Sequence, residues 1–466
     1  MTNNPEAVRQ EAHDLGKHTG AQGAGETHLK RVLGLPALVL FGLAYMVPLT
    51  VFSTLGPVAK ITDNHVPGSY VITLLVMMFT AISYGFMSRK FPVAGSAYVY
   101  SQRTFGGHAG FLTGWALLLD YILLPMINYM LLGLYLNAYF PAIPAWVFLL
   151  VAVVIVAALN IAGIASVARV NMILVAVQAV FCVVFIALSL RTASGVPSTP
   201  SVLDSVFGGN VEMAAVFTGA AILCLSFLGF DAVSTLSEEA REPHRDVPRA
   251  ILAVTVIGGL TFIVLSAVSY LVIPDWRTFD NVDTAAQDVV LAAGGHFLSN
   301  FFVAAYISGA MGSAIASQAS VSRILYSMGR DEVLPRRLFG VLSHRTSAPV
   351  RAILVVALVS LLGIVLPLEF VISIISFGAL AAFTMVNLSV VKSHVFDDRR
   401  RSPLQLVKYA VVPGIGFLLT VWLWTSLPHN AIVLGLVWLA VGVAELAVIT
   451  RGFRRKPPQM DLEEIV

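Results

Sequence analysis

The sequence predicts an all-α integral membrane protein with twelve transmembrane helices. The chain has 466 residues, of which 57% are hydrophobic and only 12% are charged. Soluble domains carry about 25% charged residues, so this composition is that of a membrane protein. Apolar runs of about 20 residues, the length that crosses a bilayer as a helix, recur along the whole chain. Two of these runs are interrupted near their middle, and the interruptions indicate which kind of membrane protein this is.

Twelve apolar segments account for most of the chain. They lie near residues 32–57, 70–88, 108–138, 145–163, 168–190, 213–237, 250–273, 297–325, 350–366, 370–392, 406–426 and 429–450. We expect them to form one transmembrane domain over residues 31–451, which leaves no room for a soluble enzyme. The ten His are scattered without metal-ligand spacing and no P-loop pattern occurs, so we expect no metal, no cofactor and no ATPase activity.

The basic residues predict how the chain is oriented. Residues 1–30 are polar and lack an apolar core, so we expect a disordered cytoplasmic tail in place of a signal peptide. With twelve spans the tail at residues 452–466 is cytoplasmic too. Only Lys60, Arg191 and Arg277 of the 29 Lys and Arg then fall outside. This asymmetry follows the positive-inside rule, and the formal charge of +3 therefore indicates no nucleic-acid binding.

The first span is interrupted in the stretch GLAYMVPLT, residues 42–50. Gly42 costs the helix backbone entropy, and Pro48 removes a hydrogen bond and clashes with the preceding turn. In lipid an unpaired backbone group is expensive, so such a break needs partners.

The sixth span is interrupted in the stretch SFLGFD, residues 226–231. Gly229 and Asp231 place a flexible residue and a carboxylate in the hydrocarbon region. The two breaks are five spans apart. Interrupted helices at matching places in successive five-helix units indicate an inverted-repeat transporter with a binding site near the middle of the bilayer.

Two intramembrane acids are candidates for that site. Asp120 and its neighbour Tyr121 lie about twelve residues into the third span, roughly 18 Å along the helix. Asp231 lies beside the second break. A charge at such a depth is costly unless it is paired, which makes both acids functional candidates. A purely structural role, protonated or hydrogen-bonded to a neighbouring helix, is the alternative for each.

The first break favours a cationic substrate. A carboxylate would need free backbone N–H groups, but residues 44–48 are bulky and Pro48 has no N–H. An anionic side chain and aromatic faces suit an ammonium group, each face contributing about 0.5–2 kcal/mol. A diamine fits this inventory. The candidate substrate-binding residues are Tyr45, Met46, Asp120, Tyr121, Phe227, Gly229, Phe230 and Asp231, with the helix breaks at Gly42, Pro48 and Gly229.

Three motifs resemble those of the amino acid–polyamine–organocation (APC) superfamily of permeases. They are FPVAGSAYVYSQRTFGGHAGFLTGW at residues 91–115, SEEAREPHRDVPRAI at 237–251 and SQASVSRILYSMGRDEVLP at 317–335. The resemblance covers residues 32–450, and within the superfamily it is nearest to bacterial putrescine importers. It implies inverted repeats over about 32–190 and 213–392, two added helices over about 406–450, alternating access, and the bacterial inner membrane.

The resemblance leaves the energy source open. Some permeases of this superfamily use a lysine in the fifth span to help carry a proton, whereas this chain has Gln178 there. Asp120, Asp231 and Glu238 are the candidates for gating or proton coupling, and exchange or facilitated transport stays possible. Glu238 and Glu239 form an inner gate with Arg241, Arg245 and Arg249, or else they belong to a solvated loop.

Other functions fit the same sequence. A permease for cationic or neutral amino acids, or an amino-acid/amine exchanger, is the main alternative, with N–H donors around Gly229 holding the carboxylate. A non-transporting sensor would usually need an added domain. The partners we expect are a polyamine or amino acid, protons and the lipid bilayer, while the oligomeric state is left open.

Overall fold

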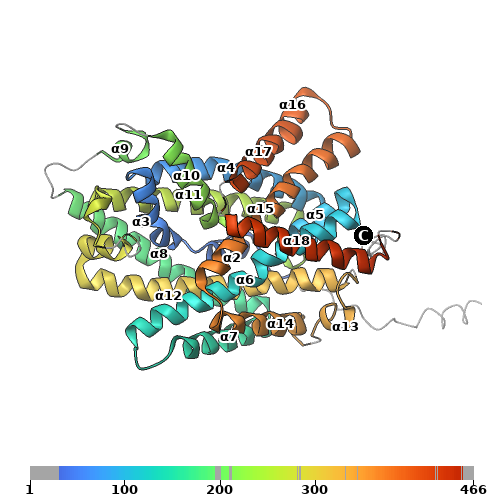
Figure 1. Ribbon diagram of the computed structural model, residues 1–466, viewed down its shortest axis with the longest axis horizontal. Coiled ribbons are helices and arrows are strands. Elements are labelled where there is room, and N and C mark those ends of the chain that lie inside the picture. Colours follow the sequence, from blue (N-terminus) through green and yellow to red (C-terminus); the bar gives the residue numbers. More distant parts are fainter. Residues whose placement is uncertain are drawn as a thin grey trace, which may run out of the picture.

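The computed structural model describes residues 31–454 except 195–200, 209–211, 281, 283–284, 331, 344, 426, 428 and 453. The predicted tails therefore lie outside the described residues, apart from positions 452 and 454. Within the described residues the secondary structure is helical, except for one isolated β-bridge between Leu33 and Ala240. Most helices run along the long axis of the molecule, which is horizontal in Figure 1.

The helices of the described chain account for the twelve predicted spans. Nine are long and apolar enough to cross a membrane, one bent pair makes a tenth, and two shorter apolar helices complete the set. The first six spans are α2 (Leu35–Met46) with α3 (Thr50–Thr62), α4 (Val66–Lys90), α6 (Gly107–Tyr139), α7 (Ala145–Ile161), α8 (Ile164–Ser194), and α10 (Met213–Leu223) with the 3-10 helices η1 (Cys224–Phe227) and η2 (Ala232–Glu239).

The last six spans are also helical, and two of them contain π-helical turns near one end. They are α11 (Pro243–Val272), α12 (Ala285–Arg330), α14 (Val350–Ser360) with η5 (Leu361–Ile364), α15 (Leu368–Val390) with η6 (Val391–Asp397), α16 (Pro403–Leu406) with η7 (Val407–Val411) and α17 (Val412–Thr425), and α18 (His429–Ile449). Short helices connect some of the spans, namely α5 (Ser96–Phe105), α9 (Val202–Phe207), η3 (Trp276–Thr278) and α13 (Arg336–Phe339).

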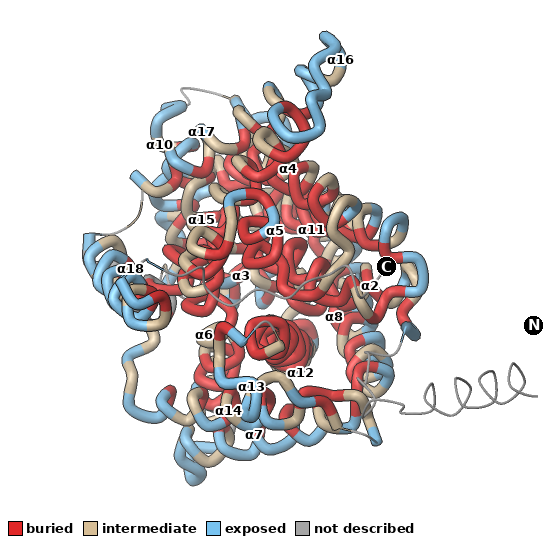
Figure 2. Tube along the Cα trace, turned by 90° about the vertical axis from the view of Figure 1, so that its right-hand side faces the viewer, coloured by how far each residue is buried: buried red, intermediate tan, exposed pale blue. Residues whose placement is uncertain are grey.

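Helix α12 begins at Ala285, before residue 297, where the eighth span was expected to start. Gly294 and Gly295 have non-helical dihedral angles inside α12, and Gly295 has φ 63°. The glycines therefore join a short first helix to the span itself. In Figure 2 α12 is seen end-on, surrounded by other helices and buried. This position makes α12 the central element against which the functional helices pack, and α8 and α6 both lie along it.

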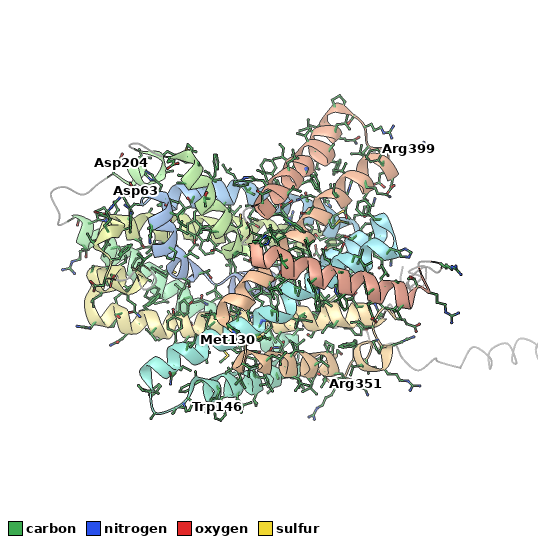
Figure 3. All side chains as sticks on the ribbon, in the orientation of Figure 1. Asp63, Met130, Trp146, Asp204, Arg351 and Arg399 are labelled. Carbon is green, nitrogen blue, oxygen red and sulfur yellow. The ribbon has the colours of Figure 1, made fainter. Side chains whose placement is uncertain are left out.

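Charged residues distinguish the two ends of the molecule. Asp63 and Asp204 lie at one end, which we call the outer end, and Arg351 and Arg399 lie at the opposite, inner end (Figure 3). The sequence predicts this separation, because basic residues collect on one side of the membrane. The interrupted spans lie between the two ends, and they position the candidate site.

Candidate functional site

The first span breaks at Val47 and Pro48. Helix α2 ends at Met46, α3 begins at Thr50, and the two are bent by 44°. Val47 has φ 54°, a left-handed conformation that is strained for a β-branched residue. A following proline disfavours the helical conformation at Val47, so Pro48 helps to fix the break. Gly42 lies inside α2 and does not form the break, contrary to the expectation from the sequence.

Backbone groups at this break have partners from other helices. The Ser313 hydroxyl of α12 donates to the carbonyl of Tyr45 at 2.9 Å, and Asn128 of α6 donates to Ser313 at 3.0 Å. The Thr50 hydroxyl donates to the carbonyl of Val47 at 2.8 Å. These bonds satisfy carbonyls that the interrupted helix leaves free. Asn128 and Ser313 are thus part of the site, although the sequence analysis did not single them out.

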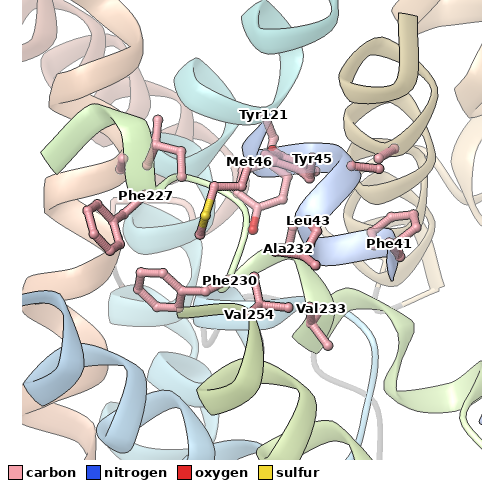
Figure 4. Packing of buried hydrophobic residues seen from close by; sticks show 14 of the residues in the cluster. Phe41, Leu43, Tyr45, Met46, Tyr121, Phe227, Phe230, Ala232, Val233 and Val254 are labelled. Carbon is pink, nitrogen blue, oxygen red and sulfur yellow. The ribbon is translucent and has the colours of Figure 1, made fainter. Parts of the chain in front are cut away.

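The second break touches the first. Helix α10 tightens into η1, and the chain turns at residues 228–231 with Gly229 at φ 131°. A Cβ atom at Gly229 would lie 2.9 Å from the backbone nitrogen of Met46 and 2.9 Å from Cδ1 of Tyr45. Only glycine allows both this conformation and this approach. In Figure 4 the Met46 side chain points toward Phe227 and Phe230, and Tyr45 lies beside Tyr121.

The two candidate acids lie close together beneath the breaks. Asp120 and Asp231 are each only 1% exposed, and they are near enough to interact electrostatically. Asp231 accepts hydrogen bonds from the Tyr121 hydroxyl at 2.5 Å and from the Gly229 N–H at 3.1 Å. Oδ1 of Asp120 has no hydrogen-bond partner among the described residues. No Lys or Arg among the residues that the structure describes forms an ion pair with Asp120 or Asp231. A buried acid pair without a cation is suited to receive one.

Tyrosines surround the acid pair. The rings of Tyr45 and Tyr121 have centroids 6.1 Å apart, and the hydroxyl groups of Tyr45 and Tyr84 lie within electrostatic range of both carboxylates. Neither of these two hydroxyls has a hydrogen-bond partner within the described residues. The region thus holds several buried polar groups with unused hydrogen-bonding capacity, which is typical of a ligand site.

A cavity of about 500 Å³ lies on the outer side of the breaks. Tyr45 and Met46 form part of its wall, and it extends outward to Gln287 and Leu368. The other candidate side chains, Asp120, Tyr121, Phe227, Phe230 and Asp231, are not part of its lining. The polar and aromatic lining residues that the sequence analysis missed include Asn128, Tyr135, Tyr306 and Ser313. An Asn two turns after Asp120 in an apolar span was an available signal.

The site therefore has two levels separated by Tyr45. Above it is the outer cavity, whose described lining contains no charged side chain. Below it lie the acid pair and Tyr121. Tyr45 belongs to both levels, and its helix ends one residue later at Met46, directly before the break.

The inner side is closed by ion pairs, but not by the expected ones. Glu239 binds Arg323 through two hydrogen bonds of 2.7 and 2.8 Å, and Glu238 binds Arg330 at 3.0 Å. Both arginines come from α12, at the end of the eighth span. Of the arginines that the sequence analysis considered, Arg245 instead pairs with Glu242. The neighbouring basic loop does not supply the partners, because η2 packs directly against α12.

Gln178 lies next to the first break. A Cβ atom at Gly309 would lie 2.8 Å from Val47 and 3.1 Å from Oε1 of Gln178, so Gly309 of α12 lies close both to the break at Val47 and to Gln178 of α8. Oε1 has no hydrogen-bond partner in the described chain. A glutamine does not titrate, so this position cannot itself carry a proton.

Comparison with known proteins agrees with this architecture. The amino acid permease family matches residues 35–449. The low-affinity putrescine importer PlaP of Escherichia coli (strain K12) is 37% identical over 449 residues, which cover 95% of this chain and 99% of PlaP. The branched-chain amino acid permease BcaP of Bacillus subtilis (strain 168) is 28% identical over 446 residues, covering 91% of this chain and 94% of BcaP.

These relatives are transporters, and the match covers every span. The resemblance inferred from the three motifs is therefore confirmed, as are the all-helical membrane fold and the expectation of a transporter in place of an enzyme. The chain belongs to the amino acid permease family.

Proposed function

We propose that this protein imports a small organic cation, putrescine or a related polyamine, by proton symport with alternating access. The observation that carries the proposal is the buried pair Asp120 and Asp231, which has no cation partner among the described residues. An ammonium group would supply the missing charge, and the aromatic rings of Tyr45 and Tyr121 would face it. We assign substrate binding to these four residues together with Met46.

The distribution of free N–H groups supports a substrate without a carboxylate. Pro48 has no N–H, and the N–H groups of Val47 and Thr50 are hydrogen-bonded to backbone carbonyls. The Gly229 N–H, which was the best alternative donor, is bonded to Asp231. A carboxylate placed here would meet two acids and few free donors, which is electrostatically unfavourable. The identity with PlaP, whose name specifies putrescine, points the same way.

We propose that the acids carry the coupled proton. A carboxylate pair this close and this buried holds one negative charge more readily than two. A proton and a cationic substrate can therefore occupy the pair alternately or share it. Glu238 is a weaker candidate, since it is bound to Arg330. Gln178 supports the same assignment, because it leaves the acids as the titratable groups at the breaks.

We also propose that residues 32–190 and 213–392 are inverted repeats with cytoplasmic termini in the bacterial inner membrane. The helix packing supports this division. Helix α8 lies along α12 and α15 lies along α6, and exchanging the two halves converts the first contact into the second. The ion pairs Glu239–Arg323 and Glu238–Arg330 both lie at the inner end. Arginines collect on the cytoplasmic side of a membrane protein, so their position supports a cytoplasmic inner end.

Amino acid transport is the second candidate, because BcaP is a branched-chain amino acid permease by name. Its substrates carry a carboxylate, so on this alternative the N–H of Gly229 must leave Asp231 when substrate binds. Competition between labelled putrescine and unlabelled amino acids distinguishes the two possibilities.

The proposal is tested by uptake into proteoliposomes. We expect saturable uptake of labelled putrescine under an inward proton gradient, abolished by a protonophore. Asp231→Asn removes the charge but keeps the shape, and losing one charged hydrogen bond of about 1.5–3 kcal/mol weakens apparent affinity roughly 10- to 100-fold. Asp204→Asn, an exposed change in α9, is the matched control and should leave uptake unchanged.

Two results would contradict the proposal. If Asp231→Asn retains wild-type affinity for putrescine, the acid pair does not bind the cation. If the folded wild-type protein takes up leucine or valine and no putrescine, the chain is an amino acid permease. Melting temperatures of both variants show whether a loss of uptake reflects a loss of fold.

A further inference from the structure

A row of buried hydroxyl groups leads from the acid pair toward the inner end. It consists of Tyr84, Ser96, Ser234, Tyr100 and Ser88, and we call it the hydroxyl row. All five residues are fully buried. They come from α4, α5 and η2; η2 packs against both α4 and α5, and the rings of Tyr84 and Tyr100 have centroids 6.1 Å apart.

The first half of the row starts at the acids. Tyr84 packs its ring edge-on against Phe230, the neighbour of Asp231, with centroids 5.8 Å apart. Its hydroxyl is within electrostatic range of both carboxylates and close to the hydroxyl of Ser96. The hydroxyl oxygens of Ser96 and Ser234 lie 2.9 Å apart, which is hydrogen-bonding distance.

The second half of the row reaches the inner end of α4. The hydroxyl of Tyr100 lies near those of Ser234 and Ser88. Ser88 is two residues before Lys90, the last residue of α4, which forms an ion pair with Asp398 at the inner surface. The row thus leads from the neighbourhood of the acids to Ser88, which is buried in the last turn of α4 at the inner end.

Two members of the row are tyrosines at positions where the ring of a phenylalanine would fill the same space. The hydroxyls of Tyr84 and Tyr100 have no hydrogen-bond partner of good geometry in the described residues. A buried hydroxyl without a partner is unfavourable, so each of these two hydroxyls retains unused capacity to donate and accept a hydrogen bond. Each hydroxyl nevertheless has another close by, and rotation about the C–O bond or one bridging water would complete the chain.

We propose that the hydroxyl row is the path by which the transported proton leaves the acid pair for the inner surface. This inference rests on the proton symport proposed above. Each hydroxyl accepts a proton on its oxygen and passes its own proton to the next oxygen, so the row gains and loses nothing in one passage. A hydroxyl is a fit element for this relay, because it is both donor and acceptor.

The test separates proton movement from substrate movement. Tyr84→Phe and Tyr100→Phe each remove one oxygen from the row and keep the ring. We expect uptake driven by a proton gradient to fall roughly tenfold or more, the scale at which a positioned proton-transfer group acts. Exchange of labelled for unlabelled putrescine without a gradient needs no net proton transfer, and we expect it to change less than about twofold.

Tyr70→Phe is the matched control. Tyr70 is also fully buried in α4, but its hydroxyl contacts Thr54 on the outer side and it is not in the row. We expect this variant to retain gradient-driven uptake. If Tyr84→Phe does not fold, Ser96→Ala interrupts the same row.

The outcomes are distinguishable. Normal gradient-driven uptake in both row variants overturns the relay and leaves proton symport intact. An equal fall in gradient-driven uptake and exchange also overturns it, because the defect then lies in substrate handling. Absence of gradient-driven uptake in the wild-type protein removes the proposed function itself.

Discussion

The outer and inner halves of the protein are closed to different degrees. The outer half contains a cavity of about 500 Å³ that reaches Tyr45, and an ion pair between Arg277 and Asp63 whose side chains are 59% and 68% exposed. The inner half has the pair Arg323 and Glu239, whose side chains are only 4% and 3% exposed. The structure is therefore that of a carrier sealed on its inner side and accessible from its outer side.

The difference lies in where the charges are. On the outer side the ions remain in water, where their attraction is weak and screened by salt. On the inner side they are removed from water and bound by two parallel hydrogen bonds, a geometry that specifies both partners. The β-bridge between Leu33 and Ala240 adds a backbone connection at the same place.

The largest expected effect comes from breaking the inner pair. Arg323→Met leaves Glu239 buried without its partner, which should destabilise the sealed state by about 3–5 kcal/mol. Thermal melting of the purified protein measures the loss. The double variant Arg323→Met with Glu239→Leu removes both charges and should recover much of the lost stability. If the double variant is as unstable as the single one, the packing of the Arg323 side chain matters and its charge does not.

An intermediate effect is expected at the boundary between the halves. Gly229→Ala forces a side chain into a left-handed conformation against Met46 and Tyr45, which should cost about 1–3 kcal/mol or more. Gly414→Ala in α17 is the matched control, because a Cβ atom there meets nothing within 4 Å among the described residues. Comparison of the two melting temperatures tests the contact between the breaks, and equal values would show that the breaks do not touch.

The smallest effect is expected at the outer pair. Arg277→Gln removes an exposed partner of Asp63 and should change stability by less than about 1 kcal/mol. Raising the salt concentration should remove even this difference, while leaving the effect of Arg323→Met in place. A loss at Arg277 as large and as insensitive to salt as that at Arg323 would refute the contrast between the halves.

The sequence predicted the fold well because membrane spans depend on local composition. All twelve apolar segments correspond to helices, and the two interrupted ones are the first and the sixth. The position of the first break was predicted less well. Gly42 and Pro48 were equivalent signals in the sequence, but α2 continues through Gly42, which packs closely against Val233 and Val254. Glycine there permits contact between helices, a role that only the tertiary structure reveals.

Partners that lie far apart in the chain were not predictable from spacing. For Glu239 the sequence left open a pairing with nearby arginines or a position in a solvated loop, whereas its partner Arg323 is 84 residues away. Likewise Asp120 and Asp231 were both assigned to the site, but their direct electrostatic interaction was not predicted. The division of the site into a cavity and a buried acid pair depends on where Tyr45 lies, which is a property of packing.

The buried inner ion pair has a consequence for the balance between conformations. When the inner side opens, Arg323 and Glu239 lose their mutual attraction but regain hydration, and the two contributions largely offset each other. Sealed and open forms can then have similar free energies despite the strength of the contact. A ligand with a few kcal/mol of preference for one form, roughly the amount that shifts an equilibrium a hundredfold or more, is enough to select between them.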